Sequence, residues 1–574
     1  MNKFRIFILF VLVVALGWAF PAHGTVHAAP LLDGTTHSGV LATDETWYAS
    51  GNPHTIDGSL TVPAGITLTL QPGVVVHLVN NGGYGQVGLL TINGTLTAVG
   101  SSADHILFTS GADSAPGEWG GLIVSGGSAQ LAYAEVRYAG YGWTCTNISY
   151  SAVCVQNAGT LSIDYTDFHD NSGPAGTGSL DGAVAAYSAS DADLINLSIT
   201  HSTFQNNGLL ASGSFYPVLL NGPGIRLVMA GNTFTANQVN RVLLQNNPLK
   251  TQTSAILTDQ VGLEAYELYP AYLSNHIVPV GSTLTVEPGV KLLTHPGAWS
   301  TGYAIIVEGT LIAQGTEADP IVMDGTDPAW GWGGLIVQGA GSAATLEHTE
   351  VLHGGHPNGS NPYSNVAALS GGRVSISHSR IADNVLGSSN YASGVIHLAD
   401  GSLSLTDSTI SNTMTSGVQF YAVYAAGANS ALEMTGNTFS GNSINAVLLG
   451  VDGLAGTRNT LRPQTGLLGY DFGVPYSSDT YTLLPAGNLT LEPGTTVRGV
   501  VGPWNKGAIF KVQGQLNASG TADEPVIFQA YGQSGLCHRP QCWPRPGLPV
   551  SGNIPQPVGG CGWSPVGLWR AHLQ

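Results

Sequence analysis

Four ionisable residues occupy two short phrases of similar pattern. Glu135 and Arg137 flank an apolar residue in AEVRYAG, and Asp167 and His169 flank another in TDFHDN. If these phrases are neighbouring strands, alternation turns all four side chains to one face and brings the two carboxylates to about 5 Å apart. Glu135 and Asp167 could then bind Ca²⁺, or act as the acid and nucleophile of a glycosidase. The simpler interpretation is a solvated patch in which Arg137 offsets two acids.

The phrases that hold these residues recur along the chain, each with an apolar residue at its centre. Each phrase alternates apolar and polar residues before Asn or Gly, which predicts a short strand and a turn. The centres, 29 to 36 residues apart, are Val136, Phe168, Phe204 and Phe234, then Val351, Ile381, Ile410 and Phe439. Strands that return at this period predict coils that stack and bury one continuous core. We expect the first four centres to form one inward column of parallel strands.

An Asn follows most of these centres at a fixed distance. Ile410 departs from the pattern, because its Asn412 comes one place early. Asn tolerates left-handed backbone geometry and can hydrogen-bond to its copies in adjacent coils. We therefore predict a structural ladder at one corner, formed by left-handed Asn residues. The Asn residues three positions after a centre are Asn171, Asn207, Asn237, Asn384 and Asn442.

A longer repeat encloses the short one. VPAGITLTLQPG (62–73), VPVGSTLTVEPG (278–289) and LPAGNLTLEPG (484–494) begin three similar segments, whose Pro72, Pro288 and Pro493 lie 216 and 205 residues apart. Self-similarity on this scale indicates an array of units. The predicted organisation is a signal peptide, two full modules, a truncated third module and an atypical tail, at residues 1–28, 45–275, 276–480, 481–530 and 531–574.

The combined repeats predict an all-β solenoid. A sandwich would usually show turn signals every 8–12 residues without such phrases, and propeller blades carry their own aromatic signatures. The succession of VPAGxTLTxEPG, GTLxAxGT, PIxFT and WGGL resembles bacterial secreted right-handed parallel β-helix repeat proteins of the pectin-lyase-like superfamily, over most of residues 45–530. The resemblance implies the fold but leaves function open, since that superfamily holds lyases, hydrolases, esterases, epimerases and non-catalytic surface rods.

Two observations weigh against catalysis. The polygalacturonase NTD, paired Asp and GHD set, the pectinesterase GxVDFIFG and zinc or serine-hydrolase motifs are missing. By analogy with β-helix lyases, Arg137 could assist proton abstraction. The second module, however, keeps only Glu350 and Arg380 at the pair positions and has Leu352 and Ala382 at the others. An enzyme needs one groove, whereas the repeats here build similar faces.

Aromatic residues supply a second kind of candidate site. Tyr84, Trp299 and Trp504 occupy equivalent loops after the PG strands. Flat exposed aromatic rings stack on sugars, so these three are the carbohydrate-binding candidates. For Trp119 and Trp332, which begin the WGGLIV segments, we expect a structural role as caps of the core at a coil corner.

Histidine is plentiful, and three copies lie close together in the second module. His348, His353 and His356 could suggest a metal site, but His353 aligns with Tyr138 of module one, which favours packing in the stack. We expect neither a cofactor nor a metal, apart from the Ca²⁺ alternative at Glu135 and Asp167.

The N-terminus and the charge balance indicate an exported protein. Lys3 and Arg5 precede an apolar run at residues 6–20, as in secretory signals, although a retained anchor is the alternative. No later segment is predicted to cross a membrane. The formal net charge is −18, with 17 Lys and Arg, so nucleic acid is excluded as a partner. A secreted or cell-surface monomer is expected.

Five cysteines fall in two groups. Cys145 and Cys154 bracket a short insertion, and in an oxidising compartment we expect them to form a disulfide. Cys537, Cys542 and Cys561 lie in the tail, which has no acidic residue after Glu524. We expect this tail to be a separate Pro-rich segment, a disordered or disulfide-bonded extension, or an out-of-frame C-terminus.

Three functions remain open at this level. The favoured one is a non-catalytic, secreted or surface β-helix that presents loops to a glycan or partner. The alternatives are a polysaccharide lyase or glycoside hydrolase, and a truncated fragment of a larger modular surface protein.

Overall fold

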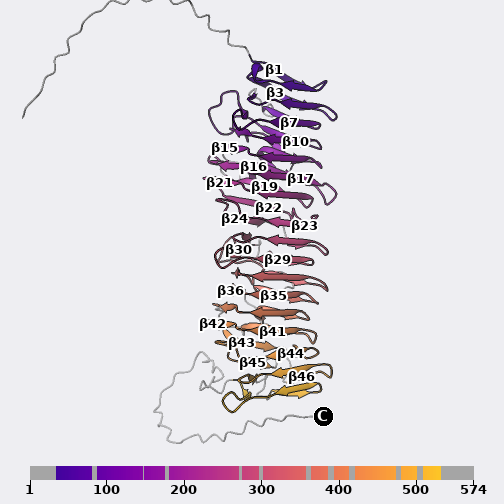
Figure 1. The fold of residues 1–574 in the computed structure, drawn as a ribbon, viewed down its shortest axis with the longest axis vertical. Coiled ribbons are helices and arrows are strands. Elements are labelled where there is room, and N and C mark those ends of the chain that lie inside the picture. The colour runs from indigo at the N-terminus through magenta and orange to yellow at the C-terminus, as the bar shows by residue number, and fades with distance from the viewer. Residues whose placement is uncertain are drawn as a thin grey trace, which may run out of the picture.

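The chain folds into a parallel β-helix, which confirms the predicted fold class. In Figure 1 its strands stack along one long axis from β1 to β46, with the order of the chain preserved along the rod. The structure is a computed structural model that describes residues 34–80, 87–146, 148–174, 180–211, 213–269, 275–296, 302–356, 363–385, 393–412, 420–450, 452–472, 480–500 and 508–531.

Each coil contributes strands to three faces, which we number in the order in which the chain visits them. The first face consists of β2 (Glu45–Trp47), β4 (Thr67–Leu70), β7 (Thr95–Val99), β10 (Ser128–Ala132), β14 (Thr160–Asp164), β17 (Ile195–Thr200), β20 (Ile225–Ala230), β23 (Ser254–Leu257), β26 (Thr283–Val286), β29 (Thr310–Gln314), β32 (Ala343–Glu347), β35 (Arg373–Ser377), β38 (Ser402–Thr406), β41 (Ala431–Thr435), β44 (Arg458–Leu461), β47 (Asn488–Leu491) and β50 (Gln515–Ala518).

The second face follows the first across a corner of very few residues, which we name the tight corner. It consists of β5 (Val75–Val79), β8 (Ile106–Ser110), β11 (Ala134–Arg137), β15 (Asp167–His169), β18 (Thr203–Gln205), β21 (Thr233–Thr235), β27 (Lys291–Thr294), β30 (Ile321–Gly325), β33 (Thr349–Leu352), β36 (Arg380–Ala382), β39 (Thr409–Ser411), β42 (Thr438–Ser440), β48 (Thr496–Gly499) and β51 (Ile527–Ala530).

The third face follows the second across longer connections, which we name the loop corner. It consists of β6 (Leu89–Ile92), β9 (Gly121–Ser125), β13 (Ile148–Gln156), β16 (Leu180–Tyr187), β19 (Ser214–Asn221), β22 (Arg241–Gln245), β25 (His276–Val278), β28 (Ile305–Val307), β31 (Leu335–Gln338), β34 (Val366–Leu369), β37 (Ser393–Ala399), β40 (Phe420–Ala426), β43 (Ile444–Leu449), β46 (Thr480–Leu483) and β49 (Ile509–Val512).

Six further elements complete the described chain. Three strands join two faces, a three-residue 3₁₀ helix lies near the N-terminal end, one strand starts the stack, and one forms a hairpin at the loop corner. They are β3 (His54–Val62), β24 (Ala265–Tyr269), β45 (Tyr470–Phe472), η1 (Ala49–Gly51), β1 (Thr36–Val40) and β12 (Trp143–Cys145). Within the described ranges, no helix has the length and apolar character needed to cross a membrane.

The inward residues of successive strands build the core. Val136 pairs with Phe168, Phe168 with Phe204, and Phe204 with Phe234, all in parallel register and all buried. The three Phe rings stack with centroids 5.0 and 5.1 Å apart. The predicted inward column is therefore confirmed, and one apolar cluster runs through the modules from Leu41 to Phe510.

The Asn ladder forms, but its backbone geometry differs from the prediction. Asn171 Nδ2 donates to Asn207 Oδ1 at 3.0 Å, and Asn207 Nδ2 donates to Asn237 Oδ1 at 2.9 Å. The left-handed residue lies one position earlier, as at Asp170 with φ 54°. The expectation of left-handed Asn was wrong because the side chain must point inward to reach the next coil, and the preceding residue makes the bend.

In module two the ladder is broken into separate pairs. Asn384 donates to Asn365 at 2.6 Å, and Asn442 donates to Asn445 at 2.8 Å. The early Asn412 is itself left-handed, with φ 59°. It therefore occupies the bend position and not the ladder position, which explains why Ile410 departed from the pattern.

The junctions between modules are places where strands change partners. β24 pairs with β22 of the third face on one side and with β27 of the second face on the other. β45 joins β43 to β48 in the same way. The first-face ladder also breaks here, between β20 and β23 and between β41 and β44. The modules are thus segments of one stack, separated by seams in the hydrogen bonding.

Two local features match their predicted structural roles. Trp119 and Trp332 are fully buried, and each indole N–H donates 2.7 Å to a backbone carbonyl at the loop corner. Cys145 and Cys154 are joined by a disulfide with Cα atoms 5.7 Å apart, which links β12 to β13. The tail cysteines and the signal segment lie outside the described residues.

Candidate functional site

The four ionisable residues singled out in the sequence lie together on the outer side of the second face. Glu135 is paired with Asp167, and Arg137 with His169, in the parallel ladder of β11 and β15. Because the residues between them point inward, all four side chains extend outward. The strands thus place two acids, one Arg and one His within a single patch of module one.

Arg137 is held by two acids. Its Nε and Nη2 atoms donate to the two carboxylate oxygens of Asp113 at 2.8 and 2.6 Å, and its Nη1 donates to Glu135. Asp113 also accepts a hydrogen bond of 2.5 Å from Thr109. The fork geometry of this pair is the strong form of an Arg–carboxylate contact. Asp113 lies in the connection after β8 and was not among the sequence candidates.

His169 is held by two acids in a similar way. Its Nε2 lies 2.9 Å from Glu135 Oε1, and its Nδ1 lies 2.7 Å from Asp170 Oδ2. Both ring nitrogens face carboxylates, which favours the doubly protonated imidazolium. Asp170 was also missed in the sequence, although it directly follows His169.

The contacts shift the pKa values toward the charged forms. The hydrogen bond from Arg137 lowers the pKa of Asp113, and the hydrogen bond with His169 lowers that of Glu135. Burial alone would lower the pKa of His169, but its hydrogen bonds to Glu135 and Asp170 outweigh burial and raise it. Burial lowers the pKa of His77, which faces Asp113 and Arg137 from the neighbouring coil. The patch is therefore a network of charged partners.

Asp167 stands apart from this network. Its Oδ1 is buried and has no hydrogen-bond partner among the described residues. A Ca²⁺ ion at the predicted Glu135–Asp167 pair would have to compete with Arg137 and His169, which both contact Glu135 Oε1. Ca²⁺ needs six to eight oxygen ligands. A glycosidase-like pair meets the same obstacle, because Arg137 and His169 already engage Glu135.

The equivalent patch of module two is smaller. Arg380 pairs with Asp383 at 2.6 Å and lies 3.9 Å from Glu350. His353 Nδ1 lies 2.8 Å from Asp324 Oδ1, and its left-handed backbone, with φ 49°, matches that of Tyr138, with φ 62°, to which it aligns. The charged networks of the two modules therefore occupy the same face with different members.

Several exposed apolar side chains belong to the loop corner, in different coils. Trp330, which follows β30, is 60% exposed, and Tyr141, after β11, is 48% exposed. Leu209 and Leu210 are exposed in the connection from β18 to β19. Among them the two aromatic rings are the binding candidates, because a flat exposed ring can stack on a ligand.

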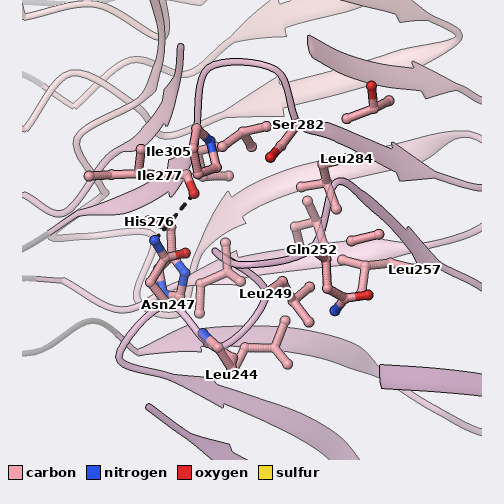
Figure 2. Close-up of a pocket in the computed structure, with 17 residues that line it drawn as sticks. Leu244, Asn247, Leu249, Gln252, Leu257, His276, Ile277, Ser282, Leu284 and Ile305 are labelled. Atoms are coloured by element: carbon pink, nitrogen blue, oxygen red, sulfur yellow. Dashed lines mark hydrogen bonds between the residues drawn. The ribbon is translucent and has the colours of Figure 1, made fainter. Parts of the chain in front are cut away.

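A cavity lies at the seam between modules one and two. Figure 2 shows its largely apolar wall, with Leu244, Leu249 and Leu257 on one side and Leu284 and Ile305 on the other. It offers about 40 Å³ of space to the centres of water-sized groups, enough for a few water molecules. The cavity lies where the third-face ladder is interrupted. β24 leaves β22 of the third face to pair with β27 of the second face, and β25 begins a new third-face ladder with β28.

His276 brings the one imidazole into this cavity wall. Its Nε2 is buried without a hydrogen-bond partner among the described residues, and burial lowers the pKa of the ring to about 3. Asn247 beside it donates to the Ile277 carbonyl at 3.2 Å (Figure 2). Leu60 and Tyr481 hold the corresponding inward position in the other modules. A neutral His is therefore kept in an apolar setting.

The three predicted sugar-binding aromatics, Tyr84, Trp299 and Trp504, lie outside the described residues. Trp330 was not among the sequence candidates. The signal that could have found it is a second Trp two residues before Trp332, since the core cap needs only one.

Comparison with known proteins supports the fold and gives no function. Residues 39–155 and 255–373 each match the family model of the pectate-lyase like beta helix domain. These segments begin at the same place in the two modules, and the first of them includes β11 of the candidate patch but ends before β15. Over these segments the chain is similar to that β-helix family. No curated protein and no solved structure matches the chain.

Proposed function

We propose that this protein is a secreted or cell-surface, non-catalytic β-helix that binds a glycan through its loop corner. The observation that carries the proposal is Trp330, whose indole is 60% exposed beside the fully buried Trp332. An exposed indole on a rigid rod offers a flat ring to a sugar at small cost in conformational entropy.

The state of the charged patch supports binding over catalysis. Arg137 is the one strong cation of the patch, and Asp113 and Glu135 already occupy it. A lyase of this superfamily would need a basic group free to take a proton from the substrate. Breaking the bidentate contact to Asp113 would leave a charged group unpaired, which is costly in a half-buried site.

A panel of acidic and neutral polysaccharides tests the proposal. The wild type is expected to retain at least one glycan, and Trp330→Ala is expected to weaken that binding about tenfold or more, as removal of one stacking ring should. Tyr48→Ala is the matched control, because Tyr48 is an aromatic of similar exposure, at 58%, in the first coil. Equal loss in both variants, or no retained glycan, would contradict the proposal.

The polysaccharide lyase or hydrolase alternative predicts a different outcome from the same panel. The wild type would release unsaturated products or reducing ends, and Arg137→Gln would no longer release them. Turnover by the wild type would replace the binding proposal with this one.

A further inference from the structure

One column of residues at the tight corner of module two combines two imidazoles with carboxylates. His348, His378 and Asp407 each make the bend between the first and second faces, with φ values of 43°, 49° and 46°. Because successive coils are in register, the three side chains leave the rod one above another. Glu347, the last residue of β32, lies directly beside the first of them.

The same column in module one holds different side chains on the same backbone. Tyr133, Tyr165 and His201 have φ values of 46°, 44° and 47°. Their rings form a stack, with centroids 4.9 Å apart for the Tyr pair and 4.7 Å apart for Tyr165 and His201. The bend therefore accepts rings of either kind, and the pair of adjacent imidazoles belongs to module two.

The ligand atoms of this column lie close enough to converge on a metal ion once their side chains rotate. Single ligand atoms of Glu347, His348 and His378 all lie within 4.8 Å of one another. The two imidazole rings stack with centroids 5.1 Å apart, and His378 Nε2 lies 4.0 Å from Asp407 Oδ2. His378 and Asp407 have side chains 51% and 53% exposed, so both can rotate toward a shared ion.

The surroundings leave these ligands available. Arg380, which lines the same open groove, contacts Asp383 at 2.6 Å and Glu350 at 3.9 Å. Glu347 accepts one hydrogen bond of 3.1 Å from Gln314, which keeps its other oxygen for a ligand. With Glu317 and Glu350 lining the same open groove, the local charge favours a cation.

We propose that His348, His378 and Glu347, with Asp407 in reach, bind a divalent first-row transition metal ion such as Zn²⁺ or Cu²⁺. Imidazole and carboxylate together select these ions, whereas Ca²⁺ and Mg²⁺ prefer oxygen ligands alone. Binding rotates both rings out of their stack so that their lone pairs converge. The ion would tie two coils of module two together at the tight corner. This site is separate from the loop corner and does not depend on glycan binding.

Calorimetric titration of the full chain, prepared without a polyhistidine tag, tests the site with Zn²⁺. We expect His378→Tyr to weaken binding at the module-two site at least about tenfold, since a ligand is lost. The substitution should preserve the fold, because Tyr165 occupies the same bend in module one. His201→Tyr is the matched control: it removes an equally exposed His, at 52%, from the same corner, and is expected to leave Zn²⁺ binding unchanged.

Electron paramagnetic resonance with Cu²⁺ supplies a readout that a change in stability would not move. The wild type should show two nitrogen ligands, and both His348→Tyr and His378→Tyr should show one. Melting curves without metal check that the variants are folded. Zn²⁺ binding that is absent from the wild type, equal in His378→Tyr, or lost in His201→Tyr would overturn the proposal, as would Cu²⁺ spectra that do not change.

Discussion

Modules one and two repeat the same backbone conformation but carry different side chains at equivalent positions. At the tight corner, module one stacks Tyr133, Tyr165 and His201, whereas module two places His348, His378 and Asp407 at the same bends. The solenoid fixes where a side chain stands and in which direction it leaves the rod. Adjacent coils stand one strand spacing apart, so two suitable residues in consecutive coils are enough to create a site. Function in this fold can therefore change module by module without a change in the core.

The inward columns give the largest expected contrast between the modules. Module one stacks three Phe rings, whereas the matching positions in module two are Ile381, Ile410 and Phe439. Phe204→Ala removes the middle ring of the stack, and should lower the free energy of unfolding by about 3–5 kcal/mol. Ile410→Ala removes fewer atoms and should cost about 2–4 kcal/mol.

Thermal unfolding followed by circular dichroism measures both variants. Because repeat stability is nearly a sum of local terms, each change should act mainly on its own module, and it can appear as a separate phase. A Phe204→Ala melting temperature equal to that of the wild type would show that the column does not carry the core.

In the charged patches of the second face, loss of the Arg should again destabilise module one more than module two. Arg137 makes three contacts with two acids in module one, and Arg380 makes one close contact in module two. Arg137→Gln removes the cationic partner of Asp113 and leaves Glu135 with His169 alone, and should cost about 1.5–3 kcal/mol. Arg380→Gln should cost about 1 kcal/mol or less, because its pairs are more exposed.

Urea denaturation of the two variants measures this contrast. The expected order is a clear decrease in midpoint for Arg137→Gln and a small one for Arg380→Gln. The reverse order would mean that the module-one patch is not the tighter network.

A substitution at the seam between modules one and two should stabilise the protein, by introducing the residue that module one has at the equivalent position. His276→Leu replaces an unpartnered buried imidazole by the residue that Leu60 provides at the same position. We expect a gain of about 1–2 kcal/mol near pH 7, since a buried nitrogen without a partner is removed. Differential scanning calorimetry should show a higher melting temperature.

The gain from His276→Leu should also increase as the pH falls. The pKa of His276 is about 3 in the folded chain, against an ordinary value of 6.5, so below pH 6.5 the unfolded wild type binds a proton that the folded one refuses. The difference between variant and wild type should widen by about 1.4 kcal/mol per pH unit from near pH 6 to near pH 3. A pH-independent difference would mean that His276 finds a partner.

The smallest predicted effect concerns the pair of Glu135 and His169. The lowered pKa of Glu135 gives stability that is present above its ordinary value of 4.5 and is lost as the pH falls through the folded pKa. The raised pKa of His169 gives stability that is present below 6.5 and is lost as the pH rises through the folded pKa. Glu135→Gln should therefore be most destabilising between pH 4.5 and 6.5, by about 1 kcal/mol. Melting curves across this range test it, and a flat profile would contradict the pairing.

The part of this structure that follows a regular period could be predicted from sequence. The central residues Val136 and Phe168 set the register of β11 and β15, and so placed Glu135 beside Asp167 correctly. The burial of Trp119 could be predicted because it begins the WGGLIV segment, which occurs in both modules. Register in a stacked coil is imposed by the core, because a slip of one residue would turn every apolar side chain outward.

The partners that decide the chemistry come from residues outside that period. Asp113 lies in a connection whose length differs between modules. Alignment of the repeated phrases therefore could not predict that Asp113 contacts Arg137. His348 and His378, in contrast, both stand three positions before a central residue. That column, compared across coils, reveals the His pair, whereas the column of Asn residues three positions after each centre does not.

The central claim is that Asp113, Glu135, Arg137, His169 and Asp170 form a closed charge network. With it stands the proposal that this rod binds without catalysis. The most direct measurement is a turnover assay on acidic and neutral polysaccharides with and without Ca²⁺, combined with calorimetric titration of the protein with Ca²⁺. The account predicts neither unsaturated products nor reducing ends, and no heat of Ca²⁺ binding that differs between the wild type and Glu135→Gln. Product formation, or a Ca²⁺ heat that disappears in Glu135→Gln, would contradict it.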